Sequence, residues 1–306
     1  MSHEVPEQQI HKPVLLQECM AYLAPQSGRL YVDGTLGLGG HTAAILERSK
    51  PDGRVLAFEW DEAALERAIP RLEKFGNRLT VIRRNFAELE CGLKEQGITE
   101  IDGLLVDIGV SSLQLDMGGR GFSFQQDERL DMRMDSRRKV TAESLLASCT
   151  EQELADIFYY FGEEKQARPI AAAIVKKRDA EPITTTKQLV RIIAQAVPKR
   201  FHPKKIHVAT KVFQAIRIAV NTELENLASV LDQAVGYLRP GSRLCVISFH
   251  SLEDRVVKRK FKNNNMLDVL TSKPVMAAGS ELAENPRARS ARLRVAQKRD
   301  TSTEKR

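Results

Sequence analysis

Asp33-Gly-Thr-Leu-Gly-Leu-Gly-Gly-His41 is the stretch that decides the fold, because it joins a short apolar run to the start of a helix. The apolar run, residues 29–33, is typical of a buried strand, and residues 42–48 have the pattern of a helix. Glycines at such a junction let the backbone approach a ligand at the helix N-terminus. The alternative is a tight turn without a ligand, which the glycines alone do not exclude.

Further apolar runs continue this alternation of strands and helices. We expect strands at residues 54–60, 79–83 and 103–107, with a helix at 62–75 after the first of them. The alternation predicts an α/β fold with a parallel sheet, and the carboxyl ends of the strands then meet at one edge where ligands bind.

An acidic side chain, Glu59, comes at the end of the second expected strand. Nucleotide-binding sheets place a ribose-binding carboxylate there, about 20 residues after the glycines. Enzymes that bind a dinucleotide such as NAD also place glycines after one strand and an acid after the next. Here, however, the glycines lack the G-x-G-x-x-G spacing, and the sequence shows no evident second nucleotide-binding half. S-adenosylmethionine needs only one nucleoside pocket and a place for its amino acid end, beside which we expect Gly39 and Gly40.

The middle of the chain interrupts the alternation. Residues 109–138 have no steady period and predict a long loop. Three expected helices share apolar residues at helical spacing, at 150–161, 167–177 and 185–196. The first pattern then returns as a helix, a strand and a helix, at 211–237, 243–249 and 251–262, followed by a less regular basic tail. We therefore expect an α/β domain at 1–114 and 204–306, with an inserted all-helical substrate-recognition domain at 115–203.

Charge is distributed unevenly along the 306 residues, whose formal net charge is +7. Residues 182–222 contain no acidic residue but eight basic ones, and the stretch from Arg287 onward is again basic. A solvated helix face is one explanation. Because the acid-free stretch includes apolar helix positions and leads directly back to the α/β domain, we favour a track for RNA phosphates. The expected RNA-binding residues are Lys199, Arg200, Lys204 and Lys205.

Cysteine spacing and the N-terminus indicate where the protein works. The four cysteines lie far apart, which favours reduced thiols over a disulfide frame or a zinc site. The N-terminus lacks the features of a signal peptide, and no apolar run has the length of a membrane span. We expect a cytoplasmic protein without a membrane partner.

Long stretches of the sequence match, in order, those of one known family. They are His11–Glu18, Asp33–His41, Asp107–Ser112, Gln114–Asp116, Arg120–Phe124, Leu130–Asp135, Phe213–Asn221, Ile247–Arg255 and Asn285–Ala291. On these stretches the chain resembles the MraW/RsmH family, which methylates the N4 amino group of a cytidine in the decoding region of bacterial small-subunit (16S) ribosomal RNA. The resemblance covers nearly the whole chain.

The resemblance implies a Rossmann-like class I S-adenosylmethionine-dependent methyltransferase sheet with a helical insertion. The cofactor contacts that it implies are Gly39, Gly40, His41, Glu59, Phe86, Asp107 and Gln114. Four positions depart from the family pattern. Glu59 replaces the usual Asp, and Leu113, Val208 and Ser242 stand where Pro, Pro and Gly are usual.

Asp107, at the end of the fourth expected strand, is the best candidate for a catalytic residue. The exocyclic amine of cytosine is a poor nucleophile, so we expect positioning of the amine nitrogen to dominate catalysis. A hydrogen-bond acceptor would help by receiving the developing positive charge. The alternative is that Asp107 serves the cofactor alone and that Ser111, Ser112 or a backbone carbonyl contacts the base.

Aromatic and acidic residues offer further candidate contacts. Phe122, Phe124 and Phe249 are possible platforms for a base outside its stack, although each has an ordinary packing explanation. His250 is a candidate contact to base or phosphate, or a buried structural histidine. The run Asp131, Arg133, Asp135, Arg137 offers carboxylates to a metal, but its alternating arginines favour internal ion pairs, and we expect no metal.

Three other kinds of function stay open at this point. A catalytically silent RNA-binding protein would tolerate loss of the loop 33–41. A methyltransferase acting on small molecules would not need an acid-free basic stretch. An NAD-dependent oxidoreductase would bind nicotinamide instead of S-adenosylmethionine.

Overall fold

The computed structural model describes residues 12–109, 114 and 118–300. The chain forms two compact units. The larger unit comprises the residues up to Gly109 together with those from Leu224 onward, and the smaller unit is Val110–Glu223.

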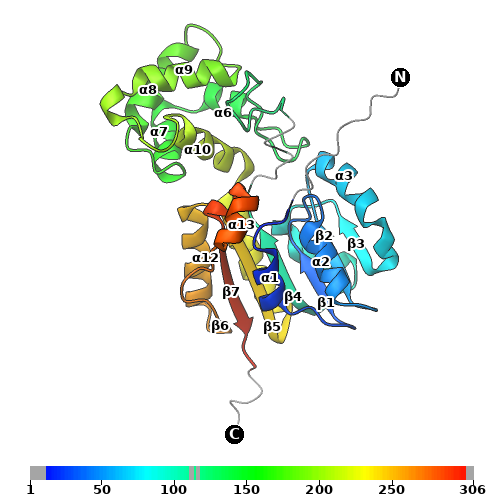
Figure 1. Cartoon of the computed structure of the whole chain (residues 1–306). Helices are drawn as coiled ribbons and strands as arrows, with labels where there is room; N and C mark the ends of the chain where they lie inside the picture. Colours follow the sequence, from blue (N-terminus) through cyan, green and yellow to red (C-terminus); the bar gives the residue numbers. More distant parts are fainter. Residues whose placement is uncertain (1–11, 110–113, 115–117, 301–306) are drawn as a thin grey trace. The chain divides into compact units, whose positions relative to one another are not determined.

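The larger unit is built on a seven-stranded sheet with the strand order β3-β2-β1-β4-β5-β7-β6 (Figure 1). The strands are β1 Leu30–Asp33, β2 Arg54–Phe58, β3 Leu79–Ile82, β4 Ile101–Asp107, β5 Leu238–Ser248, β6 Leu267–Val269 and β7 Arg292–Lys298. Strands β1 to β5 pair in parallel, whereas β7 is antiparallel to both β5 and β6. The expected α/β, Rossmann-like fold is confirmed.

Helices cover both faces of this sheet because its strands are apolar on both sides. Tyr31 and Leu105 point into one core together with residues of α1, α2 and α3, while Val32 and Leu104 point into the other with residues of α4, α11 and α12. The helices of this unit are α1 Leu16–Leu23, α2 Gly40–Arg48, α3 Glu62–Leu72, α4 Leu89–Glu95, α11 Glu223–Tyr237, α12 Ser251–Asn263 and α13 Gly279–Glu284. Its 3-10 helices are η1 Glu73–Arg78, η2 Phe86–Glu88 and η4 Pro286–Ser290.

The smaller unit is helical in its described part. Its helices are α6 Ala142–Ser148, α7 Glu151–Tyr160, α8 Ala167–Arg178, α9 Thr186–Ala196, η3 Lys199–Phe201 and α10 Thr210–Asn221. Thr141, Thr150 and Thr185 each begin a helix with a capping box, which supplies acceptors to the free N–H groups of the first turn.

The smaller unit is longer than the expected insertion, residues 115–203. It includes α10, because that helix packs against α6 and α7. The expected helix at 211–237 is therefore two helices, and the backbone turns between them at Thr222, whose φ is +50°.

The less regular tail that we expected contains two strands, β6 and β7. Apolar residues alternate along β7, but two of its buried positions are charged. Arg294 donates to the Asp254 carboxylate at 2.6 Å, and Lys298 donates to the Val235 carbonyl at 2.7 Å. These partners come from distant parts of the sequence, so the local pattern does not reveal the strand.

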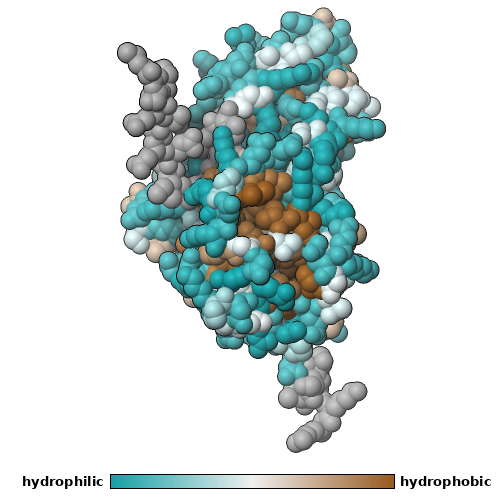
Figure 2. Space-filling view, turned by 90° about the vertical axis from the view of Figure 1, so that its right-hand side faces the viewer, coloured by the Kyte–Doolittle hydropathy of each residue, from teal (hydrophilic) through white to brown (hydrophobic). Residues whose placement is uncertain are grey.

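Hydrophilic residues cover most of the face shown in Figure 2 and surround an apolar area. Among the described residues, no helix combines the length and the apolar character needed to cross a membrane.

Candidate functional site

Three carboxylates lie at the carboxyl ends of neighbouring strands in the larger unit. Asp33 ends β1, Glu59 directly follows β2, and Asp107 ends β4. Because β2, β1 and β4 are adjacent and parallel, their ends meet at one edge of the sheet. The glycine-rich loop leaves β1 at this same edge.

Asp33 holds the two ends of the glycine-rich loop together. One carboxylate oxygen accepts from the Thr35 N–H at 3.0 Å, and the other accepts from the Thr42 hydroxyl at 2.7 Å. Burial raises the pKa of Asp33, against the opposing effects of His41 and these hydrogen bonds. This role of Asp33 is not among the roles expected from the sequence, although Asp-Gly-Thr at the start of the loop is a signal for it.

The glycines of the loop serve two different purposes. A Cβ on Gly39, whose φ is +81°, would lie 2.6 Å from Leu72 Cδ1, and one on Gly40 would lie 2.9 Å from Pro13 Cγ. Packing inside the protein therefore accounts for the lack of a side chain at Gly39 and Gly40, and their expected contact with the cofactor stays a prediction. Gly37 has a φ of +52°, and a Cβ there would have the Thr35 carbonyl, at 3.9 Å, as its nearest neighbour, so none of the described residues packs closely against this part of the backbone.

His41 is buried at the start of α2 and is held by the segment before α1. Its Nε2 donates to the Val14 carbonyl at 3.0 Å, which leaves Nδ1 as the acceptor nitrogen of a neutral ring. Burial lowers the pKa of His41, with Asp33 acting in the opposite direction. Nδ1 lies 3.8 Å from Asp107 Oδ2, too far for a direct hydrogen bond.

Glu59 is bound entirely by backbone amides in this structure. One oxygen accepts from the Gly37 N–H at 2.9 Å, and the other accepts from the N–H groups of Trp60 and Asp61, both at 2.9 Å. Burial raises the pKa of Glu59 to about 7, although these hydrogen bonds act to lower it. Glu59 therefore links the end of β2 to the glycine-rich loop.

Asp107 contains the least satisfied carboxylate of the three. Its backbone N–H donates to the Thr35 hydroxyl at 2.7 Å, which fixes its position. Oδ1 is buried and has no hydrogen-bond partner among the residues that the structure describes. Burial raises the pKa of Asp107 well above its usual range, and the nearby carboxylates of Asp33 and Glu253 raise it further. A buried oxygen without a partner calls for an explanation, and a ligand group is the simplest one.

Three further expected residues, Phe86, Phe249 and His250, lie at or near this edge of the sheet. Phe86 begins η2, and its Cβ lies 3.3 Å from where a Cβ on Gly34 would be, so it lies beside the start of the loop. A Cβ on Gly109 would lie 3.0 Å from the ring of Phe249, which follows β5. His250 begins α12, and its Nε2 lies 2.9 Å from Glu253 Oε1.

Other expected site residues belong to the smaller unit or lie outside the described residues. Gln114 is buried in the smaller unit, so its contact with the cofactor stays a prediction. Phe124 packs against His207 and Phe213 there, with ring centres 4.9 Å apart in both pairs, which supports its packing role. Ser111 and Ser112 lie outside the described residues.

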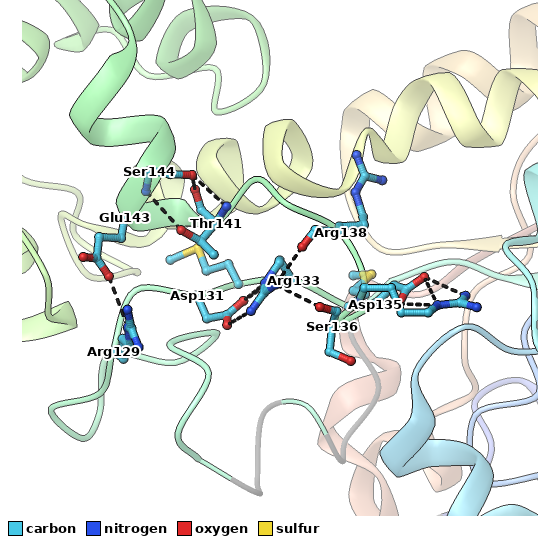
Figure 3. Close-up of polar contacts among 12 residues, drawn as sticks. Arg129, Asp131, Arg133, Asp135, Ser136, Arg138, Thr141, Glu143 and Ser144 are labelled. Carbon is cyan, nitrogen blue, oxygen red and sulfur yellow. Dashed lines mark hydrogen bonds and ion pairs between the residues drawn. The ribbon is translucent and has the colours of Figure 1, made fainter.

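The alternating Asp/Arg run forms the ion pairs expected of it (Figure 3). Arg133 donates to both oxygens of Asp131 at 2.7 Å and also binds the carbonyls of Ser136 and Arg138. Arg137 pairs in the same way with Asp135, at 2.8 Å. These carboxylates brace the loop between β4 and α6.

The expected RNA-binding residues form an exposed stretch that we name the basic tract, Lys199–Lys205. Lys199, Arg200, Lys204 and Lys205 are all exposed. The Arg200 guanidinium lies 4.8 Å from the ring centre of Phe201, which is itself 49% exposed. An exposed aromatic ring among cations is typical of surfaces that bind single-stranded nucleic acid.

The larger unit combines a Rossmann-like sheet, whose β7 is antiparallel, with carboxylates at the ends of β1, β2 and β4 and a glycine-rich loop after β1. Together these features define an S-adenosylmethionine-dependent methyltransferase of class I. The sequence matches the model of the MraW methylase family over residues 8–299. The chain belongs to the MraW methylase family.

Similar proteins are known by sequence and by structure. Ribosomal RNA small subunit methyltransferase H of Desulfotalea psychrophila is 66% identical, with 95% of this chain and 99% of that protein covered. The protein of the same name from Geotalea uraniireducens is 48% identical, with 94% and 98% covered. A crystal structure of an rRNA methylase from Streptococcus thermophilus is 12% identical, with 95% and 99% covered and a TM-score of 0.45.

Proposed function

We propose that this chain transfers the methyl group of S-adenosylmethionine to the N4 amino group of a cytidine in the decoding region of small-subunit (16S) ribosomal RNA. Membership of the MraW methylase family supports this reaction. A relative at 66% identity, named as a methyltransferase of small-subunit ribosomal RNA, supports the choice of substrate. We infer that the protein acts in the cytoplasm, where that RNA is found.

The observation that carries the proposal is the buried Oδ1 of Asp107 at the end of β4, which has no hydrogen-bond partner within the described part of the chain. An amine nucleophile needs an acceptor for its hydrogen while the nitrogen gains positive charge. Asp107 supplies such an acceptor beside the glycine-rich loop, and its raised pKa makes it a stronger base than an exposed aspartate. Oδ1 of Asp107 would accept the proton that the amine loses when the methyl group passes to its nitrogen and the bond from that methyl group to the cofactor sulfur breaks.

The residues around Asp107 fit S-adenosylmethionine. When bound, this cofactor supplies an electrophilic methyl group on a positively charged sulfur. Asp33, Glu59 and Asp107 place three carboxyl groups at this edge; burial raises their pKa values, and a bound cation favours their ionised forms. Gly37 leaves room for a ligand against the backbone, and Glu59 lies where Rossmann-like sheets place the carboxylate for ribose hydroxyls. Glu59, whose Oε2 accepts from the Gly37 N–H in this structure, would hold the ribose hydroxyls of the cofactor.

We assign RNA binding to the basic tract. Its four cations are exposed, and within the described part of the chain they form no ion pair with a carboxylate. The smaller unit, which contains the tract, is accordingly the substrate-recognition domain. The expectation that no metal takes part stays a prediction, supported by the arginines that occupy Asp131 and Asp135.

The test is transfer of labelled methyl from S-adenosylmethionine to small ribosomal subunits from a strain that lacks this protein. The modified nucleoside is then identified by mass spectrometry, and N4-methylated cytidine is the expected product. A variant, Asp107→Asn, should lose about 100-fold or more in single-turnover rate even when the cofactor is saturating. Full methylation by that variant would show that Asp107 is not the acceptor, and no label in any nucleoside would refute the proposed function.

A further inference from the structure

The segment before α1, Lys12–Leu15, packs directly against the glycine-rich loop. Pro13 occupies the space that a Cβ on Gly40 would need, and the Val14 carbonyl accepts from His41 Nε2 at 3.0 Å. We name Lys12–Leu15 the N-terminal segment. The conformation of the loop at Gly40 and His41 therefore depends on where this segment lies.

The N-terminal segment has a backbone conformation that needs support. Leu15 is in the left-handed region, with a φ of 53° and a ψ of 34°, which residues other than glycine rarely adopt. Its side chain is fully buried in the core that α1 and α2 share. Such a conformation persists where the surroundings hold it from several sides.

A carboxylate from the far end of the sequence supplies that support. The Leu15 N–H donates to Glu281 Oε1 of α13 at 2.8 Å. Just after α13, the Asn285 side chain donates to the Lys12 carbonyl at 3.1 Å. Figure 1 shows α13 and the chain that leads into α1 at the same edge of the sheet.

These contacts also explain two sequence stretches that the reaction itself does not use. His11–Glu18 and Asn285–Ala291 both belong to the stretches on which the chain resembles the MraW/RsmH family, yet the carboxylates at the three strand ends lie elsewhere in the sequence. In the structure, Lys12 and Asn285 are hydrogen-bonded to each other. Their shared task is to hold the N-terminal segment.

We propose that Glu281 is a positioning residue for cofactor binding: by holding the Leu15 N–H, it keeps the N-terminal segment against Gly40 and His41 and so fixes the loop that receives S-adenosylmethionine. The inference rests on the proposed cofactor and goes beyond the residues at the strand ends. Glu281 acts through the segment and does not touch the reacting atoms.

The nearby residue Glu284 offers a matched control on the same helix. Its carboxylate pairs with Lys12 Nζ at 2.5 Å, but the side chains are 61% and 63% exposed. Exposed ion pairs contribute little. Loss of Glu284 removes the same charge from α13 without removing the support of Leu15.

The experiment measures cofactor affinity by calorimetry, RNA affinity, and hydrogen exchange of the amides near Leu15 in the protein without cofactor. Glu281→Ala is expected to weaken S-adenosylmethionine binding roughly tenfold, since a hydrogen bond to a charged group is removed, and to speed exchange near Leu15. Glu281→Gln keeps an acceptor and should bind nearly as the wild type does. RNA affinity should stay unchanged in both, and Glu284→Ala should match the wild type throughout.

Wild-type cofactor affinity and unchanged exchange in Glu281→Ala would overturn the inference. Equal losses of cofactor affinity, RNA affinity and thermal stability would overturn it as well, because they would mark Glu281 as a general structural residue. If Glu281→Ala does not fold, Asn285→Ala is expected to give the same selective effect in weaker form, and its absence would count against the inference. If the wild type itself does not bind S-adenosylmethionine, the proposed function fails first.

Discussion

Replacement of Glu59 by Gln should change how the stability of the protein depends on pH. Burial raises the pKa of Glu59 from 4.5 to about 7. A raised carboxyl pKa means that the folded state prefers the protonated form of Glu59. The stability that protonated Glu59 contributes is therefore fully present below about pH 4.5 and is lost as the pH rises through 7. At about 1.36 kcal/mol per pKa unit, the total loss is about 3.4 kcal/mol, and about 2.5 kcal/mol of it falls between pH 5 and 8.

Glutamine has nearly the same shape but does not titrate, so the variant lacks this pH-dependent loss. It also gives up one acceptor, which costs about 1–3 kcal/mol at every pH because the Gly37 N–H then meets an amide group. The free energy of unfolding of the wild type minus that of Glu59→Gln should therefore fall by about 2.5 kcal/mol from pH 5 to 8.

Urea unfolding at several pH values, without cofactor, measures this difference. The control is Glu66→Gln, which changes an exposed glutamate on α3 and should keep the pH dependence of the wild type. A difference between the wild type and Glu59→Gln that stays constant from pH 5 to 8 would refute the reasoning.

Two further predictions concern the basic tract and the glycine-rich loop. Changing the four cations of the tract together to Ala should weaken RNA binding and make it depend less on salt. The slope of log K against log salt should become less steep by up to about 0.7–0.9 for each phosphate that these cations neutralise. An unchanged slope in filter binding at several KCl concentrations would exclude the tract as an RNA-binding site. Gly40→Ala should lower both the melting temperature and the affinity for S-adenosylmethionine, because its Cβ would lie 2.9 Å from Pro13. Gly236→Ala, in α11, is the control: apart from the backbone of its own helix, no described residue would lie within 4 Å of the new Cβ, and the change should instead be stabilising by roughly 0.5–1 kcal/mol.

Local patterns predicted the parallel strands and the glycine-rich loop, because apolar runs and glycines report directly on burial and backbone freedom. They failed where the deciding contact is distant in sequence. Arg294 and Lys298 look like surface residues until Asp254 and the Val235 carbonyl are placed beside them. The break at Thr222 has no glycine or proline to announce it, and apolar residues continue at helical spacing on both sides.

The candidate site was predictable in a similar measure. The strand ends fix Glu59 and Asp107, so their position at one edge follows from the order of strands. The contacts that hold these site residues in place could not be predicted from the order of strands. Thr35 under Asp107 and the Val14 carbonyl on His41 are contacts between segments, and spacing along the chain carries no sign of them.

The raised pKa values at the strand ends predict that cofactor binding releases protons. At pH 7, a carboxyl with a pKa of about 7 is half protonated, as expected of Glu59, and Asp107 is raised as well. A bound positive charge favours the ionised form of nearby carboxylates. If it lowers the pKa of Glu59 by only one unit, Glu59 releases roughly 0.4 of a proton.

S-adenosylhomocysteine provides the matched control, because it lacks the methyl group and its sulfur is uncharged. Calorimetry at pH 7 in buffers of different ionisation enthalpy should therefore give a larger proton release for S-adenosylmethionine than for S-adenosylhomocysteine. Glu59→Gln should reduce the release for both ligands, since any change of its pKa by hydrogen bonds to ribose is removed too. Equal proton release for the two ligands would mean that the carboxylates at this edge do not sense the charge on sulfur, and electrostatic attraction would no longer explain why three of them lie together at the strand ends.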